Sequence, residues 1–455
     1  KNLEDDPETI VKRNWHTLLK EYYADALIAD RTAIENRPAE DGSVFIVSSK
    51  RRKTKLPGIT FNPRQGHGPL DSDRSFIAGL KLSSLPRAYL ENMRPSRARD
   101  GIARTLDQEE IETRLETYLR RRGEKELNRV RDQAYVISKK IDMAKEFKQL
   151  DELIGSLLGT RDVEMISETA KARKQGLPFD PDRIERFTGL FHTLREIAPL
   201  YRPATKLSQV EKTNLSFFEA YFSNFIEGTE FEVEEAANII FGNAIPAERP
   251  EDAHDILGTF RIVSNYDDMS RLPENFDHFL KLLKHRHAIF MEQRPDKNPG
   301  QFITKTNVAG STSFVDPDLV IGTLKKGYEI YKGLDDPFCR AVYMMFLVSE
   351  VHPFTDGNGR AARMMMNAEL VSHNEQKIII PTVYRNNYIT ALKAITHNNF
   401  FDPLIRTLNF AQKYTQAIDW SDFEHTRKIL AETNAFMDPT IADSEGIRLR
   451  LPVGA

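Results

Sequence analysis

Apolar side chains recur at helical spacing just inside the N-terminus. Val11, Trp15 and Leu18 lie three or four positions apart, and the pair Asp6-Pro7 precedes them. A capping aspartate followed by proline is typical of a helix start, so we expect a helix from about residue 7. Residues 44–47 and 59–61 are short β-branched and aromatic runs, which predict two strands. Residues 1–100 are therefore expected to form a small mixed α/β domain.

The rest of the chain is patterned mainly as helix. Between residues 105 and 158, Leu115, Leu119, Leu127 and Val130 form an apolar stripe, which predicts a long amphipathic helix. Helical periodicity continues from Pro181 and is interrupted only by a Gly-, Pro- and Ser-rich stretch. The expected fold class is mainly α. After the α/β domain we expect a helical connecting region at 101–180, a helical domain at 181–417 and a C-terminal extension at 418–455.

The composition is that of an ordinary globular protein. Among 455 residues, 64 Lys and Arg against 67 Asp and Glu give a net charge of −3, which excludes a wholly basic nucleic-acid coat and an acidic solvating tail. No apolar run approaches the roughly 20 residues that cross a bilayer, and residues 1–6 do not form a signal peptide. Cys339, the single cysteine, can form neither an internal disulfide nor a thiolate metal site. We therefore expect a cytoplasmic protein with no membrane partner. The chain opens on Lys rather than Met, which is compatible with further residues upstream.

Two runs of basic residues need an interpretation. Residues 50–55 hold five Lys and Arg between the two predicted strands. A solvated hairpin tip is the simpler explanation of this run, and a nucleic-acid contact is the alternative. The arginines at 120–122 lie among glutamates, so their charge is balanced and they indicate a solvated helix face.

The segment HPFTDGNGRAAR, which begins at His352, stands apart from the rest of the chain. Pro353 disfavours helical dihedrals in the residue before it, so the apolar helical run that precedes the segment should end at His352. Strong helix formers follow from Ala361. The glycines and asparagine between them therefore lie in a tight turn that opens a helix, where backbone N–H groups can converge on an anion.

The side chains around this turn form one chemical set. Arg360 and Arg363 lie on one helix face, and both can bind phosphate oxygens. Asp356 offers a hard carboxylate oxygen that suits Mg²⁺ bridged to phosphates. His352 has an unperturbed pKa of about 6.5, as a general base near neutrality needs. The combination indicates phosphoryl-type transfer. The alternative is a polar helix cap with two surface arginines and a hydrogen-bonded histidine.

The whole segment resembles the core motif of the Fic family, His-Pro-Phe-x-Asp/Glu-Gly-Asn-Gly/Lys-Arg-x-x-Arg, at every position. The family's domain is a helical bundle with a β-hairpin flap, and most members transfer AMP from ATP to a protein hydroxyl. The resemblance implies ATP as co-substrate, Mg²⁺ as cofactor and, as partner, a protein with an exposed Ser, Thr or Tyr. Self-modification and a homo-oligomer both remain open. Gly359 stands where one branch of the family has Lys, which favours nucleotidyl transfer over phosphorylation of the target.

The resemblance also implies a role for each position of the motif. His352 deprotonates the target hydroxyl, and Phe354 anchors the loop in the core. Asp356 holds Mg²⁺ against the α- and β-phosphates. The implied ATP-binding residues of this segment are Asp356, Gly357, Asn358, Gly359, Arg360 and Arg363.

A second match lies upstream, at Ser223-Asn224-Phe225-Ile226-Glu227-Gly228. It fits the family's inhibitory motif, Ser/Thr-x-x-x-Glu-Gly/Asn. Ser223 and Glu227 are i, i+4 neighbours on a helix that Gly228 can end. The resemblance implies a bidentate salt bridge from Glu227 to Arg363, which keeps that arginine from the γ-phosphate. A surface glutamate near a helix end is the alternative.

The family's flap and adenine side have counterparts too. We expect a hairpin within residues 297–317 that holds a target segment by strand addition. Its Asn307, Val308, Ala309 and Gly310 are then candidate ATP contacts. Ile303 departs from the Arg that usually follows the flap phenylalanine. Tyr388 is expected against the adenine, with ordinary helix packing as the alternative, and Asn398 is a candidate polar contact to the base.

The N-terminal part carries a fainter resemblance. Residues 15–35 and the Leu56-Pro57-Gly58 turn look a little like the body domain of type IV abortive-infection antitoxins, which are transcriptional-regulator-like. Three functions thus follow from the sequence. The first is an autoinhibited protein adenylyltransferase. The second is a Fic enzyme that removes AMP or transfers another nucleotide, and the third is a nucleotide-sensing, antitoxin-like regulator that binds DNA.

Overall fold

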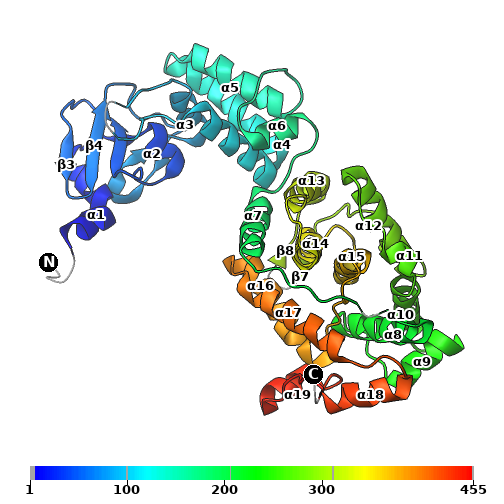
Figure 1. Ribbon diagram of the computed structural model, residues 1–455. Coiled ribbons are helices and arrows are strands. Elements are labelled where there is room, and N and C mark those ends of the chain that lie inside the picture. The colour runs from blue at the N-terminus through cyan, green and yellow to red at the C-terminus, as the bar shows by residue number, and fades with distance from the viewer. Residues whose placement is uncertain (1–5, 99–100, 205, 310–311, 453–455) are drawn as a thin grey trace. The chain divides into compact units, whose positions relative to one another are not determined.

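The computed structural model describes residues 6–98, 101–204, 206–309 and 312–452. It divides the chain into two compact units, Lys1–Pro178 and Phe179–Ala455 (Figure 1). The region between residues 101 and 178, expected as a connecting segment, packs into the core of the N-terminal unit. The expected C-terminal extension likewise packs into the core of the C-terminal unit, through Trp420, Leu430 and Leu449. Each unit is described by itself below.

The described residues of the N-terminal unit form a six-stranded mixed sheet and six α-helices. The strands are β1 (Leu27–Ile28), β2 (Ser43–Val47), β3 (Thr54–Leu56), β4 (Ile59–Arg64), β5 (Arg74–Ser75) and β6 (Lys81–Leu82). The helices are α1 (Pro7–Tyr22), α2 (Asp30–Glu35), α3 (Leu85–Asn92), α4 (Gln108–Lys140), α5 (Ala144–Leu157) and α6 (Glu168–Lys174), with a 3₁₀ turn η1 (Ile77–Gly79). The strand order is β3-β4-β2-β1-β6-β5.

The two strands predicted in this unit are confirmed as β2 and β4, but the connection between them was misread. β2 and β4 pair in parallel, from Ser43 opposite Thr60 to Val47 opposite Arg64. A hairpin joins antiparallel strands only, so the basic run at 50–55 cannot be its tip. The hairpin is β3–β4, through the turn at Pro57 and Gly58, and the basic run leads into the edge strand β3.

Helix α1 begins where the sequence predicted it. Asp6 caps α1 by accepting the backbone N–H of Thr9, and Trp15 and Leu19 of this helix are buried. The stretch from 105 to 158, expected as one long helix, forms the two helices α4 and α5. The chain turns between them at Asp142, whose φ is 54°. The predicted leucine stripe of α4 is buried, so the pattern located the buried face although it missed the turn.

Over the residues that are described, the C-terminal unit is helical apart from one small hairpin. Its first helices are α7 (Pro181–Arg195), α8 (Gln209–Ile226), α9 (Val233–Gly242), α10 (Pro250–Val263), α11 (Tyr266–Met269) and α12 (Phe276–Phe290). The hairpin β7 (Val308–Ala309) and β8 (Thr312–Ser313) follows, between the 3₁₀ turns η2 (Pro295–Lys297) and η3 (Pro317–Leu319). The chain ends in α13 (Val320–Tyr331), α14 (Pro337–Val351), α15 (Asn358–Ser372), η4 (Thr382–Tyr384), α16 (Arg385–Asn398), α17 (Asp402–Ala417), α18 (Phe423–Glu432) and α19 (Pro439–Glu445).

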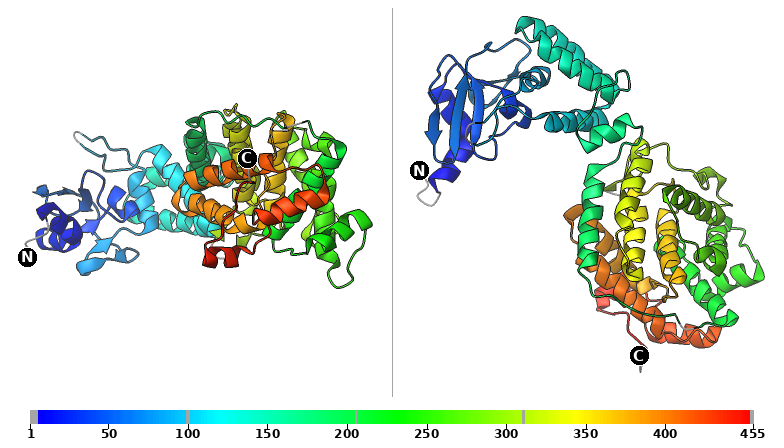
Figure 2. Two further views of the ribbon diagram at one scale, coloured as in Figure 1. Left: turned by 60° about the horizontal axis from the view of Figure 1, so that its bottom comes forward. Right: turned by 45° about the horizontal axis from the view of Figure 1, so that its top comes forward.

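Two adjacent helices, α14 and α15, form the centre of this unit. Figures 1 and 2 show them inside a ring made by the other helices. Residues on every side of α14 are buried, from Phe338 to Val351, as a helix surrounded by other helices requires. The loop that carries the HPFTDGNGR segment joins these two helices, so its ends are held by the best-packed part of the unit. Among the described residues, no helix combines the length and apolarity needed to span a membrane.

Candidate active site

The loop between α14 and α15 is shaped by two left-handed residues. His352 ends α14 with φ 57° and ψ 54°, and Gly357 begins α15 with φ 72°. The predicted helix end at His352 and the tight turn before α15 are both confirmed. A non-glycine residue in this backbone region is uncommon and costs energy. The conformation of His352 is held in place because the loop on its C-terminal side is fixed by hydrogen bonds.

Asn358 provides much of this fixation. Its side-chain oxygen accepts the backbone N–H of Phe354 over 2.8 Å, and its amide nitrogen donates to the Phe354 carbonyl over 2.7 Å. The amide is 2% exposed and Phe354 is fully buried. The side chain of Asn358 therefore closes the loop on itself. The backbone N–H groups at the start of α15, which lack partners within the helix, are the groups available to an anion.

His287 of α12 is a residue of this site that sequence reasoning missed. Its ring stacks on Phe354 with centroids 3.7 Å apart. Gly300 N–H donates to its Nδ1 over 2.8 Å, which leaves Nε2–H to donate to the Asp356 carbonyl over 3.0 Å. Burial lowers the pKa of His287 to about 4, so the ring is neutral at physiological pH. His287 therefore supports the loop from the interior of the domain, and we assign it no part in the reaction.

The expected base, His352, is covered by a phenylalanine from the hairpin region. The rings of His352 and Phe314 stack with centroids 3.7 Å apart and 10° between their planes. Nδ1 lies 3.4 Å from the Ser349 carbonyl, which favours a proton on Nδ1 and leaves Nε2 as the acceptor. Burial lowers the pKa of His352 to about 4. The imidazole is therefore unprotonated at neutral pH and able to accept a proton.

The first arginine of the segment, Arg360, is held by a buried carboxylate. Its Nη1 lies 2.9 Å from Asp255 Oδ2 of α10 and 3.3 Å from Asn224 Oδ1 of α8. Both charged side chains are buried, and Arg360 Nε has no hydrogen-bond partner among the described residues. Arg294 also reaches Asp255, at 3.2 Å. Nothing in the sequence pattern pointed to Asp255.

The second arginine, Arg363, is bound to the end of α8. Its Nε donates to Ser223 Oγ over 3.0 Å, and its Nη2 donates to the Ser223 carbonyl over 2.9 Å and to Glu227 Oε1 over 2.7 Å. Glu227 thus accepts one hydrogen bond, not the two of the expected bidentate pair. Ser223 supplies the other acceptors. Glu227 is the C-cap of α8, and Gly228 follows with φ 93°, so the helix ends where the sequence predicted.

A cavity of about 210 Å³ brings several of these groups together. Its lining includes Glu227, Phe314, His352, Arg363 and Tyr388. Ligand pockets usually measure about 300–1,000 Å³, so this space is too small for a whole nucleoside triphosphate. Tyr388 is buried, with its hydroxyl 3.3 Å from Met345 Sδ. Asn398 is exposed at the end of α16 and does not line the cavity.

The hairpin is tied to the loop and to α7. Asn307 Nδ2 donates to the Phe354 carbonyl over 2.6 Å, and Arg183 Nη2 of α7 donates to the Ser313 carbonyl over 2.6 Å. Val308 is exposed. Ile303 is buried, and its backbone N–H donates to the Pro353 carbonyl over 2.9 Å. β7 and β8 thus form the hairpin predicted for 297–317, and Gly310 lies outside the described residues.

Asp356 is the acidic group best placed to hold a metal ion. Its Oδ1 accepts the N–H of Gly357 over 2.6 Å, and its side chain is 40% exposed. Among the described residues, no group of three or more His, Cys, Asp or Glu could form a metal site by itself. Mg²⁺ is often held by one or two carboxylates together with substrate phosphates. A single accessible carboxylate beside an anion-binding turn fits that arrangement.

Fold and loop together define a helical domain built around a Fic core motif. Residues 276–370 match the Fic/DOC family, so this part of the chain is a Fic domain. A protein adenylyltransferase, fic-1, of Caenorhabditis elegans is 24% identical over 210 residues, which are 44% of this chain and 40% of that protein. A protein adenylyltransferase Fic of Drosophila grimshawi is 23% identical, over 51% of this chain and 52% of its own. The chain thus spans about half or less of these relatives.

A solved structure of C. elegans Fic-1, residues 134–508, aligns with 72% of this chain and 89% of its own. The TM-score is 0.36 and the sequence identity 17%.

Proposed function

We propose that the chain is an autoinhibited protein adenylyltransferase, which transfers AMP from Mg-ATP to a Ser, Thr or Tyr hydroxyl of a protein and releases pyrophosphate. One observation carries this proposal. The histidine and the second arginine of the Fic motif line one cavity together with Glu227, which is hydrogen-bonded to that arginine. The name shared by the relatives supports the same chemistry.

His352 is the proposed general base. Its free Nε2 takes the proton of the target hydroxyl, and the hydroxyl oxygen attacks the α-phosphorus of ATP. The bond from that phosphorus to the bridging oxygen breaks, and pyrophosphate leaves with the electron pair. The base needs to be unprotonated and next to the attacking oxygen. The lowered pKa of His352 meets the first condition, and displacement of Phe314 by the target segment would meet the second.

The start of α15 and its arginines are proposed to bind the phosphates. The N–H groups of the turn at Gly357 point to an anion, and Arg363 takes the γ-phosphate once Glu227 has left it. Asp356 is the residue that would hold Mg²⁺, which neutralises charge on the phosphates when bound. Arg360 reaches the phosphates only if a nitrogen that Asp255 does not use turns toward them.

Inhibition follows from competition for Arg363. While Glu227 accepts its hydrogen bond, the γ-phosphate has no guanidinium to bind and would meet a carboxylate instead. Tyr388 and Glu227 line the same small cavity, so the space that their side chains occupy is not open to the nucleotide. ATP then binds with its α-phosphate turned away from His352, so transfer is slow until the end of α8 moves.

The test measures incorporation of label from α-³²P-ATP into the chain itself and into a protein extract. Glu227→Gly removes the competing carboxylate, so we expect transfer to rise about tenfold or more, the equivalent of one charge-assisted hydrogen bond. Glu230→Gly is the matched control, because Glu230 is an exposed glutamate three residues further along the chain. Equal labelling by the wild type and Glu227→Gly would refute inhibition. An absence of labelling in both proteins would refute transfer.

Removal of AMP is a second candidate activity, favoured by one observation. The Glu227 side chain is 31% exposed and lines the cavity with His352, so its carboxylate can orient a water molecule toward a bound AMP ester. This reaction needs Glu227, whereas transfer is limited by it. Glu227→Gly should therefore lose any AMP-removing activity while it gains transfer, and the two activities can be measured on the same labelled protein.

A further inference from the structure

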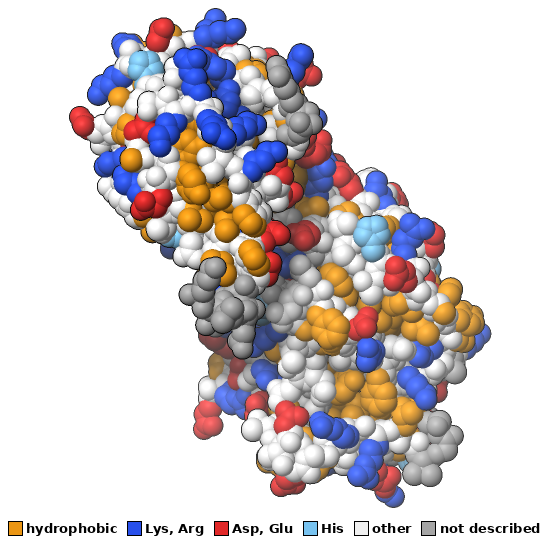
Figure 3. Space-filling model, turned by 90° about the vertical axis from the view of Figure 1, so that its left-hand side faces the viewer, with side chains coloured by type: hydrophobic (Ala, Val, Ile, Leu, Met, Phe, Trp, Pro, Cys, Tyr) orange, Lys and Arg blue, Asp and Glu red, His pale blue; other side chains and the backbone are white. Residues whose placement is uncertain are grey.

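The N-terminal unit differs in charge from the Fic domain. Residues 1–178 contain 34 Lys and Arg against 29 Asp and Glu, whereas residues 179–455 contain 30 against 38. The net charge of the whole chain is therefore the sum of a basic unit and an acidic unit. Figure 3 shows Lys and Arg side chains gathered on the face of the N-terminal unit that is drawn in its upper part. A basic unit on an otherwise acidic chain indicates an anionic partner for that unit.

A cavity of about 270 Å³ in this unit is lined by four arginines. They are Arg64, Arg87, Arg94 and Arg104, and we call the cavity the arginine pocket. Arg64 and Arg104 bind the fully buried Asp30, at 2.7 and 2.9 Å, and Arg87 binds Asp73 and Glu91. Glu91 itself lines the pocket, whereas Asp30 and Asp73 do not, so the lining carries four arginines and one carboxylate.

Several guanidinium nitrogens of the pocket remain available to a ligand. Arg94 donates through Nε to Glu146 over 2.7 Å, and its two terminal nitrogens have no acceptor among the described residues. Arg104 uses Nη1 on Asp30, while its Nη2 likewise has no acceptor in the described part of the chain. The free N–H groups of two adjacent arginines match the oxygens of a phosphate group.

The backbone behind the pocket is left-handed at one residue and is held by hydrogen bonds. Asp30 has φ 55°, a region that side chains other than Gly, Asn and Asp rarely adopt. Its N–H donates to Glu91 Oε2 over 3.1 Å, and Glu91 also accepts from Ser83. Burial, and then the neighbouring Asp30, raise the pKa of Glu91. The backbone at the base of the pocket is therefore fixed by hydrogen bonds.

The basic segment at 50–55 lies beside this pocket. Arg51 Nη2 donates to Gln65 Oε1 over 3.1 Å, and Gln65 lines the pocket. The five basic side chains of the segment are exposed, and none forms an ion pair with a described residue. A pocket of this size admits a phosphate and its sugar but not a longer ligand. Anything larger must continue across the surface, where the basic segment begins.

We propose that the arginine pocket binds a backbone phosphate of a polynucleotide, whose strand continues over the basic segment at residues 50–55. The neighbouring phosphates meet Arg51, Arg52 and Lys53, which supply charge without reading sequence. This site is independent of the proposed transfer activity of the Fic domain.

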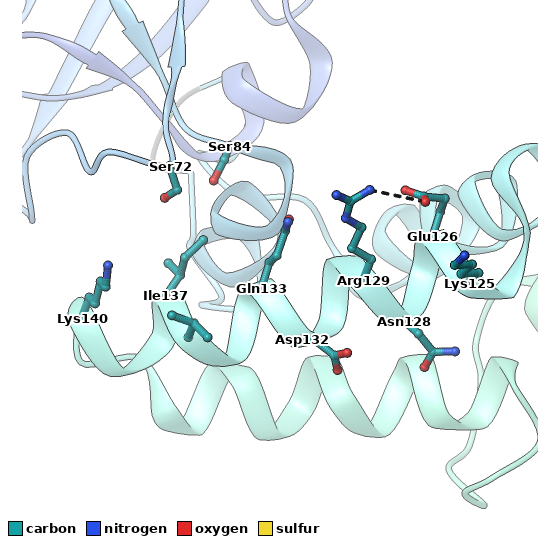
Figure 4. A pocket seen from close by; sticks show the side chains of 11 residues that line it. Ser72, Ser84, Lys125, Glu126, Asn128, Arg129, Asp132, Gln133, Ile137 and Lys140 are labelled. Atoms are coloured by element: carbon teal, nitrogen blue, oxygen red, sulfur yellow. Dashed lines mark ion pairs between the residues drawn. The ribbon is translucent and has the colours of Figure 1, made fainter.

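A second hollow on the same unit provides the control. It is a groove of about 1100 Å³ along α4, near Ser72 and Ser84, and Figure 4 shows its side chains. Its charges are mixed, because Lys125, Arg129 and Lys140 share the lining with Glu126 and Asp132, and Arg129 lies 3.6 Å from Glu126. Loss of basic residues here changes the net charge of the unit without touching the arginine pocket.

The experiment measures binding of a fluorescein-labelled DNA strand to the full chain by anisotropy, over a series of salt concentrations. The segment variant is Arg51→Gln with Arg52→Gln and Lys53→Gln. The pocket variant is Arg94→Gln, chosen because Arg94 is exposed and does not support Asp30. The control variant is Arg122→Gln with Lys125→Gln and Arg129→Gln. It removes the same number of positive charges as the segment variant, also from exposed positions. Thermal unfolding of each variant shows that it folds.

We expect the segment variant to bind at least tenfold more weakly and to lower the slope of log K against log salt by about 2, since each phosphate contact contributes roughly 0.7 for a single strand. The pocket variant should bind at least threefold more weakly, and the control variant within twofold of the wild type. Equal losses in the segment and control variants would reduce the effect to net charge and overturn the proposal. So would an Arg94→Gln variant that binds like the wild type, or full competition by millimolar inorganic phosphate.

Discussion

Two arginines one helical turn apart on α15 are both held by carboxylates, yet the two pairs are built differently. Asp255 lies inside α10, and the side chains of Asp255 and Arg360 are 6% and 3% exposed. Glu227 is the C-cap of α8, its side chain is 31% exposed, and a glycine with positive φ follows it. A carboxylate that is almost fully buried cannot leave its partner unless the residues around it rearrange. One at a helix end can leave by rotation of its own side chain.

The energetic balance of the two pairs differs in the same way. Burial raises the pKa of Asp255 even though Arg360 and Arg294 act in the opposite direction, so the loss of water around this carboxylate outweighs its ion pairs. A buried pair of this kind fixes geometry more than it adds stability, and loss of one partner strands the other charge. The Glu227 pair keeps contact with solvent, so it can be exchanged for a phosphate. By this comparison Arg360 has a structural role, whereas Arg363 is the arginine proposed to be regulated.

The largest expected effect tests whether release of Arg363 acts through His352. In the Glu227→Gly background, His352→Ala should lower AMP transfer by a factor on the order of 10²–10⁴, because the general base is lost. ATP affinity should stay within a few-fold, since nothing assigns the histidine to the phosphates. Labelling and nucleotide binding are measured on the same preparations. Near-normal transfer by the double variant would show that His352 is not the general base. It would also contradict the idea that release of Arg363 acts through His352.

The next prediction addresses the structural pair. Asp255→Asn should lower the free energy of unfolding by about 3–5 kcal/mol, because Arg360 is left buried without its carboxylate. Glu227→Gly should change it by about 1 kcal/mol or less, because a partly exposed pair contributes little. Urea unfolding of both variants and the wild type measures the contrast. Equal losses of stability in the two variants would contradict the distinction between the pairs.

A third prediction uses pH, because a neutral histidine lies beside each pair. Burial lowers the pKa of both His287 and His352 from 6.5 to about 4. The unfolded chain therefore takes up these protons at higher pH than the folded chain. Stability is fully present above about pH 6.5 and is lost as the pH falls toward 4. Thermal unfolding between pH 7 and 4.5 should show this decline, and His287→Asn should make it shallower. An identical pH slope in the variant would mean that His287 is not buried in its neutral form.

The smallest expected effect concerns Ser223, which supports the regulated pair without carrying charge. Ser223→Ala removes the hydroxyl that accepts from Arg363 Nε but keeps the carbonyl that accepts from Nη2. Because the acceptor is uncharged, we set this bond at about 1 kcal/mol, so transfer should rise by about fivefold, clearly less than in Glu227→Gly. The same labelling assay measures it. A rise as large as that of Glu227→Gly would assign the inhibition to the serine.

The local parts of this site could be predicted from the sequence. A proline fixes the end of α14, a glycine fixes the start of α15, and His352, Asp356, Arg360 and Arg363 follow from their places in one contiguous motif. The helix start at Asp6 and the buried stripe of α4 could be predicted from the sequence as well. Each of these inferences depends on residues within a few positions of one another, where capping and periodicity act.

The partners of these residues could not be predicted, because each comes from a distant element. His287, Asp255 and Phe314 reach the motif from α12, α10 and the hairpin, and no local pattern marks a residue for a contact across 38 or more positions. The parallel pairing of β2 with β4 was missed for the same reason. Strands of two residues, such as β1, are too short to show any periodicity.

The contact between Glu227 and Arg363 depends on the absence of a side chain at Gly359. A Cβ added at this residue would lie 2.2 Å from Glu227 Oε1, although the backbone of Gly359 is helical and accepts any side chain. A single added methyl group would therefore displace the Glu227 carboxylate from Arg363. It would remove no charged group from the site. Gly359→Ala should then behave as a constitutively active enzyme by steric means alone. In the proposed autoinhibition, Glu227 can therefore reach Arg363 only while residue 359 has no Cβ.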